Sequence, residues 1–213
     1  MARKKEPDLK EKNRTRILQI SKELFLKNGI ENTRICDIAK AAKMCKSTLY
    51  VYYRSKEEII NDLSLEAMEY FYHRLKEQVD AAHMDLHERY MTICQELVLL
   101  KENYPMSFEL LLEEIRVDEK SLQENGILLK IYEIGEAINR LLYTLFQDGE
   151  KPKEEREMFC QVFMQWGSIC GLILLADNKS AYIDKSTGYS KEEFLEKGFE
   201  NLFLVYAAGG KTA

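Results

Sequence analysis

The chain has 213 residues, of which 46% are hydrophobic and 31% are charged. This balance is typical of a folded globular protein and argues against a disordered chain. The five cysteines are odd in number and form no Cys-x-x-Cys pair, which favours reduced thiols in a cytoplasmic protein. We find no apolar run that approaches the roughly 18 residues needed to cross a bilayer, and no signal peptide in the charged first residues.

The net charge of −5 hides an uneven distribution. Residues 1–60 carry 15 basic and 8 acidic side chains, so that this part is +7, whereas residues 61–213 carry 16 basic and 28 acidic ones and are −12. A basic head on an acidic body favours binding of nucleic acid through the head alone, because the duplex repels the body.

The sequence predicts an all-α protein. In the head we expect helices at about residues 8–28, 35–42, 46–51 and from 55 to 79, with Ser55 and Glu58 as a capping box. In the body we expect helices at 85–103, 106–116, 121–148, 152–177 and 190–208. No sustained alternation of apolar and polar residues indicates a strand. We divide the chain into a helix-turn-helix domain, 1–54, and a larger helical body, 55–213.

The predicted helix at residues 46–51 is too short to be stable alone, and it is rich in side chains that can reach base edges and phosphates. The run FLKNGIENTRICDIAKAAKMCKSTLYVYYRSKEEII, which contains it, resembles the DNA-binding head of the TetR family of bacterial one-component transcriptional regulators. The resemblance rests on twelve positions across three helices: Phe25, Gly29, Thr33, Ile38, Ala39, Ala42, Thr48, Leu49, Tyr50, Tyr52, Ser55 and Lys56.

The resemblance implies that the third helix enters the major groove of an operator. Lys46, Ser47 and Thr48 would face base edges there, and Tyr50 would project from the same face. Phosphate contacts would come from Thr33, Lys43, Tyr52 and Lys56. For each residue alone, a solvated side chain is the simpler reading. We expect Leu49 and Tyr53 to point back into the protein, against Ile17, Phe25 and Ile38.

Two residues depart from the family pattern. Lys43 stands where glycine is usual, so it must adopt a positive φ or the turn is built differently. Cys45 stands at a helix N-cap where serine is usual. A thiol is a poor cap, but its position between Lys43 and Lys46 lowers a thiol pKa, which leaves drift and a redox switch as alternatives.

The resemblance also implies a homodimer, a small-molecule effector that is apolar or aromatic, and release of the repressor when the effector binds. We expect the dimer interface on the last two helices, at Phe159, Phe163, Gly167, Cys170, Gly171, Leu174, Leu195, Phe199, Leu202 and Tyr206. The effector pocket would be lined by Tyr90, Cys94, Phe108, Leu112, Tyr132, Tyr143, Phe163 and Trp166, although plain core packing explains each of them as well.

Other chemistry has little support in the sequence. His83 and His87 have the i, i+4 spacing of a metal site but no third ligand nearby, so we expect neither a metal nor a cofactor. We find no phosphate-binding loop and no nucleophile motif, which argues against an enzyme. A helical interaction module whose head has lost DNA binding remains the alternative, because Lys43 and Cys45 would permit that loss.

Overall fold

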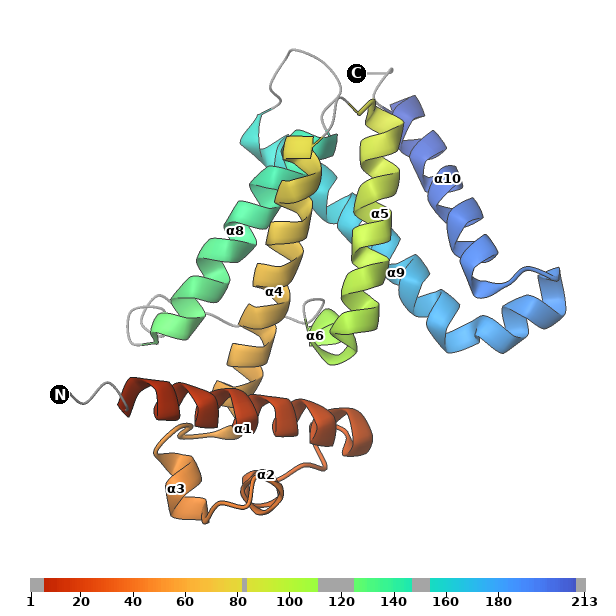
Figure 1. The fold of residues 1–213 in the computed structure, drawn as a ribbon. Coiled ribbons are helices and arrows are strands. Elements are labelled where there is room, and N and C mark those ends of the chain that lie inside the picture. Colours follow the sequence, from red (N-terminus) through yellow and green to blue (C-terminus); the bar gives the residue numbers. More distant parts are fainter. Residues whose placement is uncertain (1–5, 82–83, 111–124, 147–153, 210–213) are drawn as a thin grey trace. The chain divides into compact units, whose positions relative to one another are not determined.

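The computed structural model describes residues 6–81, 84–110, 125–146 and 154–209, and in these ranges the chain forms nine α-helices and no strand (Figure 1). Contacts divide the chain into two compact units. The first contains residues 1–68 and 106–132, and the second contains residues 69–105 and 133–213. The expectation of an all-α fold is confirmed.

The first unit is built on three helices at the N-terminal end, α1 (Glu6–Asn28), α2 (Ile35–Ala41) and α3 (Lys46–Tyr50), followed by the start of α4 (Lys56–Ala81). The short helix α6 (Pro105–Leu110) and the first residues of α8 (Gly126–Phe146) also belong to it. The head helices lie within two residues of their predicted bounds. The helix predicted at 106–116 can be followed only to Leu110, because residues 111–124 lie outside the described ranges.

The second unit contains the rest of α4 and α8 together with α5 (Leu86–Asn103), α9 (Glu155–Thr187) and α10 (Lys191–Gly209). Helices α5, α9 and α10 pack against one another (Figure 1). A Cβ added to Gly198 would lie 2.3 Å from Leu172 Cδ2, so the absence of a side chain at Gly198 lets α10 approach α9 closely.

Helix caps follow the sequence closely. At α5, Asp85 and Glu88 form a reciprocal capping box, and Ser190 and Glu193 form another before α10. Helix α9 was predicted to end at residue 177 but continues to Thr187, where Gly188 adopts φ 73° and ends it. The polar residues after 177 are solvated, while Ala176 and Ile183 continue the buried stripe.

Candidate nucleic-acid interface

Helix α3 presents its polar side chains to solvent. Lys46, Ser47, Thr48 and Tyr50 are all exposed, and the Lys46 ammonium lies 5.6 Å from the centre of the Tyr50 ring. That distance permits a cation–π contact, which keeps both groups on the same face. Leu49, between them, is fully buried. The helix therefore exposes a continuous polar surface on a single apolar anchor.

The platform beneath α3 is the core of the first unit. Leu49 and Tyr53 belong to one cluster of buried side chains with Ile17 and Phe25 of α1 and Ile38 of α2. This confirms the packing predicted from the sequence. A five-residue helix cannot hold its shape alone, so this packing fixes its position.

The turn between α2 and α3 contains a residue with the positive φ that glycine usually adopts, but the residue is a lysine. Lys43 has φ 54°, which is one of the two alternatives that the departure from the family pattern left open. Its N–H donates to the Lys40 carbonyl (3.1 Å), and the Met44 N–H donates to the Ala39 carbonyl (2.9 Å). These two bonds form the Schellman motif that ends many helices. The Lys43 side chain itself is exposed beside α3.

Cys45 is the N-cap residue of α3 and makes no capping hydrogen bond through its side chain. Its exposed sulfur lies 3.1 Å from Ser47 Oγ and 2.8 Å from Thr48 Oγ1. Hydrogen bonds with these two hydroxyls lower the pKa of the Cys45 thiol to about 7. The thiol therefore ionises within the physiological range, at the edge of the exposed surface of α3.

Tyr52, two residues after α3, lies beside α1. Its hydroxyl oxygen accepts a hydrogen bond from Asn13 Nδ2 (2.8 Å). A phenol oxygen that accepts this bond keeps its own hydrogen available for a second partner. Tyr52 is half-buried and packs against the core of the first unit.

Lys56 begins α4 and reaches back to the loop after α1. Its Nζ donates to the Ile30 carbonyl (2.8 Å), which leaves two of the three ammonium hydrogens for other acceptors. Ser55 Oγ accepts from the Glu58 N–H (3.3 Å), while the Glu58 carboxylate accepts from the Arg54 N–H (2.7 Å). The predicted cap is thus present, with Arg54 rather than Ser55 as the returning donor.

Thr33 is only 1% exposed. Its hydroxyl donates to the Gly29 carbonyl (2.8 Å) and lies 3.4 Å from the Leu24 carbonyl, and its N–H donates to the Ile30 carbonyl (3.2 Å). The side chain therefore closes the loop between α1 and α2 rather than reaching outward.

A buried polar network that sequence reasoning missed joins α1 to α4. Arg14 Nε donates to Asp62 Oδ2 (3.0 Å), the Arg14 Nη2 group pairs with the same oxygen, and the Tyr53 hydroxyl donates to it (2.7 Å). The Arg14 guanidinium also lies 4.8 Å from the centre of the Tyr53 ring. Burial, followed by the bond to Asp62, raises the pKa of Tyr53. One available signal was Tyr53 itself, because a buried phenol needs a partner.

The residues predicted for the dimer interface divide into two groups. Cys170, Leu195 and Phe199 are at most 5% exposed within one chain. Phe163 is 59% exposed, and Gly167 and Gly171 are exposed with no atom within 4 Å of an added Cβ. Phe159, Leu174, Leu202 and Tyr206 are half-buried.

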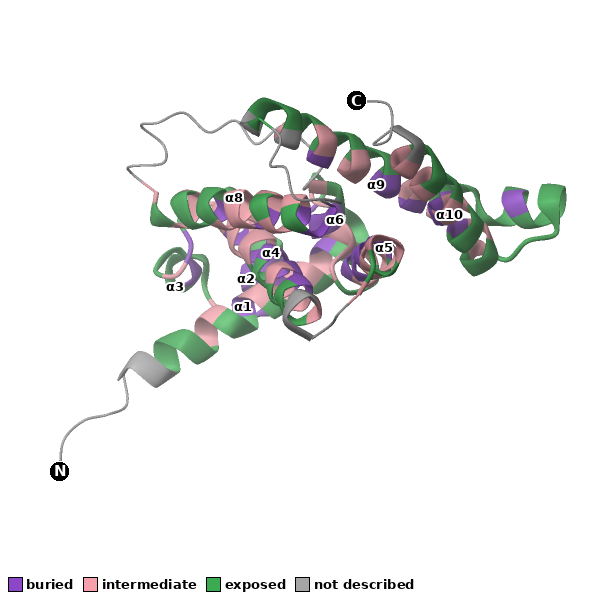
Figure 2. Ribbon diagram, turned by 90° about the horizontal axis from the view of Figure 1, so that it is seen from above, coloured by how far each residue is buried: buried purple, intermediate pink, exposed green. Residues whose placement is uncertain are grey.

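The exposed residues of α9 extend this surface along the helix (Figure 2). Met164 is 64% exposed, Leu175 47% and Tyr182 70%, although none of them was predicted. Helix α9 also contains an apolar window of 18 residues with mean hydropathy 1.6, of which 28% is buried. By length and composition this window could cross a membrane, so the expectation that no such run exists is wrong.

The residues predicted to line an effector pocket do not form one group. Tyr90 and Cys94 are buried in the second unit, and Tyr143 and Trp166 are half-buried there. Phe108 is buried in the first unit, where Tyr132 is 52% exposed. The exposure of Phe163 was given above, and Leu112 lies outside the described ranges.

Tyr90 is the centre of an aromatic cluster. Its ring lies 5.3 Å from Phe203, 5.8 Å from Phe146 and 6.0 Å from Tyr206, between centroids. The Tyr90 hydroxyl donates to Gln165 Oε1 (3.3 Å), and burial raises its pKa. This part of the second unit therefore combines large apolar area with a few polar groups.

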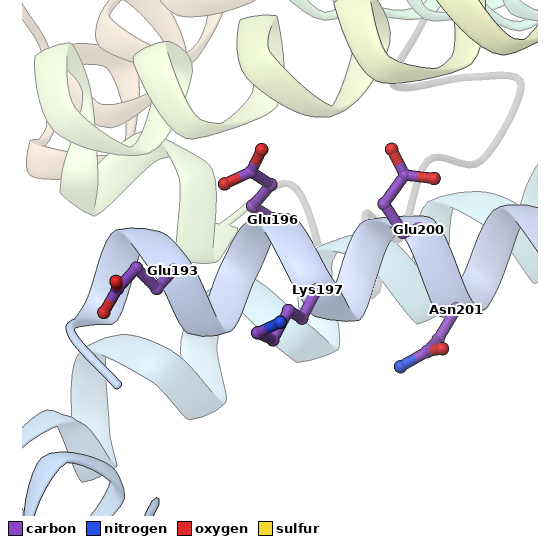
Figure 3. A pocket seen from close by; sticks show the side chains of 5 residues that line it. All are labelled: Glu193, Glu196, Lys197, Glu200 and Asn201. Atoms are coloured by element: carbon purple, nitrogen blue, oxygen red, sulfur yellow. The ribbon is translucent and has the colours of Figure 1, made fainter. Parts of the chain in front are cut away.

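A hollow of about 530 Å³ lies on the surface of α10 (Figure 3). It is lined by Glu193, Glu196, Lys197, Glu200 and Asn201, none of which was predicted to bind a ligand. Glu200 meets His87 Nε2 of α5 at 2.9 and 3.0 Å, while His83 lies outside the described ranges. Within those ranges no group of three or more His, Cys, Asp or Glu side chains could hold a metal.

Comparison with known proteins places the head in a family. Residues 17–63 match the family of bacterial regulatory proteins called the tetR family. The fatty acid metabolism regulator protein of Bacillus subtilis (strain 168) is 25% identical over 141 residues, which cover 66% of this chain and 70% of that protein. The transcriptional regulator UidR of Escherichia coli (strain K12) is 33% identical over 70 residues, about a third of each chain.

Solved structures share the fold over almost the whole chain. The fatty acid degradation regulator FadR from Bacillus halodurans superposes with a TM-score of 0.60 at 21% identity, covering 93% of this chain and 95% of that one. FadR from Bacillus subtilis, solved in complex with stearoyl-CoA, gives a TM-score of 0.59 at 19% identity and covers 87% and 95%. These relatives are transcriptional regulators and not enzymes.

Proposed function

Because this chain belongs to the TetR family of bacterial regulatory proteins and is a DNA-binding transcriptional regulator, we propose that it is a homodimeric repressor. It binds a palindromic operator in the cytoplasm through α3 of each protomer, and a small apolar molecule bound in the helical body releases it. The observation that carries the proposal is the surface of α3. Four polar side chains are exposed there while Leu49 and Tyr53 hold the helix on its core.

Base contacts are assigned to the exposed face of α3. Lys46 can donate to O6 and N7 of guanine, while Ser47 and Thr48 can use their hydroxyls and Thr48 its methyl group. Tyr50 supplies apolar area next to Lys46. A helix of this length reads only a few base pairs, so specificity requires a second copy on the other half-site.

Phosphate contacts are assigned to the rim of this face. The Tyr52 hydroxyl keeps a hydrogen, the Lys56 ammonium keeps two, and Lys43 is exposed at the turn. Thr33, which is buried, supports the loop to which Lys56 is bonded and contributes to phosphate binding through Lys56. Lys43 and Lys56 of both protomers neutralise four phosphates per dimer, which contributes about −4 to the slope of a log–log plot of affinity against salt.

The dimer is assigned to the exposed side of α9. Phe163, Met164 and Leu175 expose apolar side chains on α9, which we call the apolar strip, and Gly167 and Gly171 between them allow close approach of a second helix. On α10, Leu204 and Val205 are 62% and 74% exposed. Burial of such area is the main favourable term in association, so a second copy of the same strip is the partner that these faces fit.

The effector is assigned to the aromatic part of the second unit around Tyr90 and Cys94. Apolar walls with a few polar groups suit a hydrophobic ligand. The similarity to the fatty acid metabolism regulator spans 141 residues and so extends beyond the head. The FadR structure with stearoyl-CoA makes a long-chain acyl thioester the first compound to test.

The DNA proposal is tested by two alanine variants on an operator selected from a random duplex pool. Lys46→Ala should lower operator affinity by about 1–3 kcal/mol while leaving random DNA almost unaffected. Lys56→Ala should weaken both alike, because a phosphate contact carries no sequence information. Fluorescence anisotropy over a range of KCl concentrations measures both effects. Equal losses from both variants on both duplexes would contradict the assigned roles.

The dimer proposal is tested with Met164→Glu, which places a charge in the apolar strip. Its control is Ser180→Glu, an exposed position about 160° around the helix at 100° per residue. Met164→Glu should convert the protein to a monomer by light scattering and lower operator affinity at least about a hundredfold, since the second head no longer binds the same duplex. A dimer that survives Met164→Glu would exclude this strip as the interface.

The effector proposal has an internal probe, because Trp166 is the only tryptophan. It makes an edge contact with Phe71 at 5.7 Å in the second unit. Stearoyl-CoA should change its fluorescence and raise the melting temperature by about 5–10 °C at a hundredfold excess over Kd. Coenzyme A alone is the control. Release of the operator by the thioester would support the proposal, and unchanged fluorescence and DNA binding would remove this ligand class.

A further inference from the structure

Two consecutive residues of α1 hold two consecutive tyrosines that follow α3. Asn13 bonds to Tyr52, and Arg14 lies over Tyr53 while sharing Asp62 with it. Tyr53 is buried, whereas Arg14, Asn13 and Tyr52 are half-buried. The two contacts therefore fix the segment after α3 against α1.

The bonds of Asp62 with Arg14 and Tyr53 fix the position of Tyr53. The single oxygen Asp62 Oδ2 accepts from Arg14 Nε at 3.0 Å and from the Tyr53 hydroxyl at 2.7 Å. Charge-assisted bonds of this kind are about twice as strong as neutral ones. Because Tyr53 is fixed in this way, the backbone of Tyr52 beside it has little freedom to move.

The hydrogen bond between Asn13 and Tyr52 sets the direction of the Tyr52 hydroxyl. Asn13 Nδ2 donates to the Tyr52 hydroxyl at 2.8 Å, so the phenol oxygen is the acceptor in this bond. An O–H group that accepts from the protein donates elsewhere. Since Tyr52 lies at the rim of the α3 surface, its hydroxyl hydrogen is directed to the solvent side. A phosphate oxygen would lie on that side in a complex with DNA.

We infer that Asn13 is a positioning residue of the DNA-binding site: its amide orients the Tyr52 hydroxyl so that the hydroxyl hydrogen points to the DNA backbone. This inference rests on the proposed function. It gives Asn13 a role without requiring it to touch DNA, and it makes the direction of one hydrogen bond decisive.

The test is a near-isosteric change that reverses that direction. In Asn13→Asp the carboxylate can only accept, so the Tyr52 hydroxyl must donate inward and lose its hydrogen for the phosphate. In Asn13→Ala the hydroxyl is merely released. We expect operator and random DNA to bind about 3–10-fold more weakly in Asn13→Ala and at least about tenfold more weakly in Asn13→Asp.

Tyr52→Phe supplies the matched background. If Asn13 acts through the hydroxyl, Asn13→Ala should have less than about a twofold effect in Tyr52→Phe protein. Asn13→Asp in that background retains only the repulsion of its new charge, which raising KCl from about 0.1 M to 0.3 M reduces. Thermal melting of each variant separates these effects from loss of the fold.

Several results would overturn the inference. Equal losses from Asn13→Ala with and without the Tyr52 hydroxyl would mean that Asn13 acts independently of it. DNA binding in Asn13→Asp as tight as in the parent would mean that Tyr52 already donates inward. Failure of the parent protein to bind any duplex in a salt-dependent way would instead remove the proposed function itself, so the two failures are distinguishable.

Discussion

Replacement of Lys43 by glycine should raise stability and weaken DNA binding at the same time. Lys43 has φ 54° in a complete Schellman turn, so its backbone is strained while its side chain is exposed beside α3. Lys43→Gly removes both the strain and the charge. Lys43→Ala removes the charge but keeps a Cβ in the left-handed region, so the difference between the two variants isolates the backbone.

The size of the effect follows from two opposing terms. The left-handed conformation costs an L-residue roughly 1–2 kcal/mol, which glycine avoids. Glycine in turn loses about 0.5–1 kcal/mol through the greater freedom of its unfolded chain. Lys43→Gly should therefore be about 0.5–1 kcal/mol more stable than Lys43→Ala. For a chain of this length the difference is about 1–4 °C in melting temperature.

Differential scanning calorimetry of the parent and both variants measures the stability, and salt-dependent anisotropy measures DNA binding. Both variants should lose the same affinity and reduce the salt slope by about 1 for each protomer. A glycine variant that melts below the alanine variant would show that the strain at φ 54° is smaller than the cost of the added freedom of the unfolded chain. Full affinity in both variants would show that the Lys43 side chain does not reach a phosphate.

Two other groups have environments that solution measurements can test. Bonds with Ser47 and Thr48 lower the pKa of Cys45 to about 7, so the alkylation rate of Cys45 plotted against pH should have a midpoint near 7. The rate should also fall when the operator is bound. Mass spectrometry of peptides measures the alkylation, and a midpoint near 9 would contradict the expected pKa. Arg74 donates to Glu96, which is only 4% exposed, at 2.6 and 2.9 Å. Arg74→Ala should thus lower the free energy of unfolding in urea by about 2 kcal/mol, and Arg74→Lys by less.

The head could be predicted from the sequence because its signals are local. Capping residues, the spacing of apolar side chains and the short third helix gave bounds within two residues of those observed. The inward positions of Leu49 and Tyr53 followed from the resemblance to the family. The network of Arg14, Tyr53 and Asp62 could not be predicted in this way. Arg14 and Asp62 are 48 residues apart, and only the packing of α1 on α4 brings them together.

The body was harder to predict because an apolar residue of a helix can pack either within its own chain or against a second copy. The buried residues of α9 and α10, such as Cys170 and Phe199, have the same composition as those that remain exposed, such as Phe163. Periodicity shows that a helix is apolar on several sides but not which side its own chain covers. Helix α9 continues past the predicted end at residue 177 through a mostly exposed stretch in which Ile183 is buried.

In the head, residues that are adjacent in the sequence alternate between facing outward and packing inside. Thr48 is exposed and Leu49 is buried; Tyr52 is half-buried, and Tyr53 is bonded inside. Because α3 has five residues, its own hydrogen bonds cannot keep it rigid, and its geometry depends on the inward neighbours. Substitutions that touch no nucleotide, at Asp62 for example, should therefore reduce affinity by moving the outward neighbours. Affinity for DNA in this protein is in that sense a property of the core as much as of the surface.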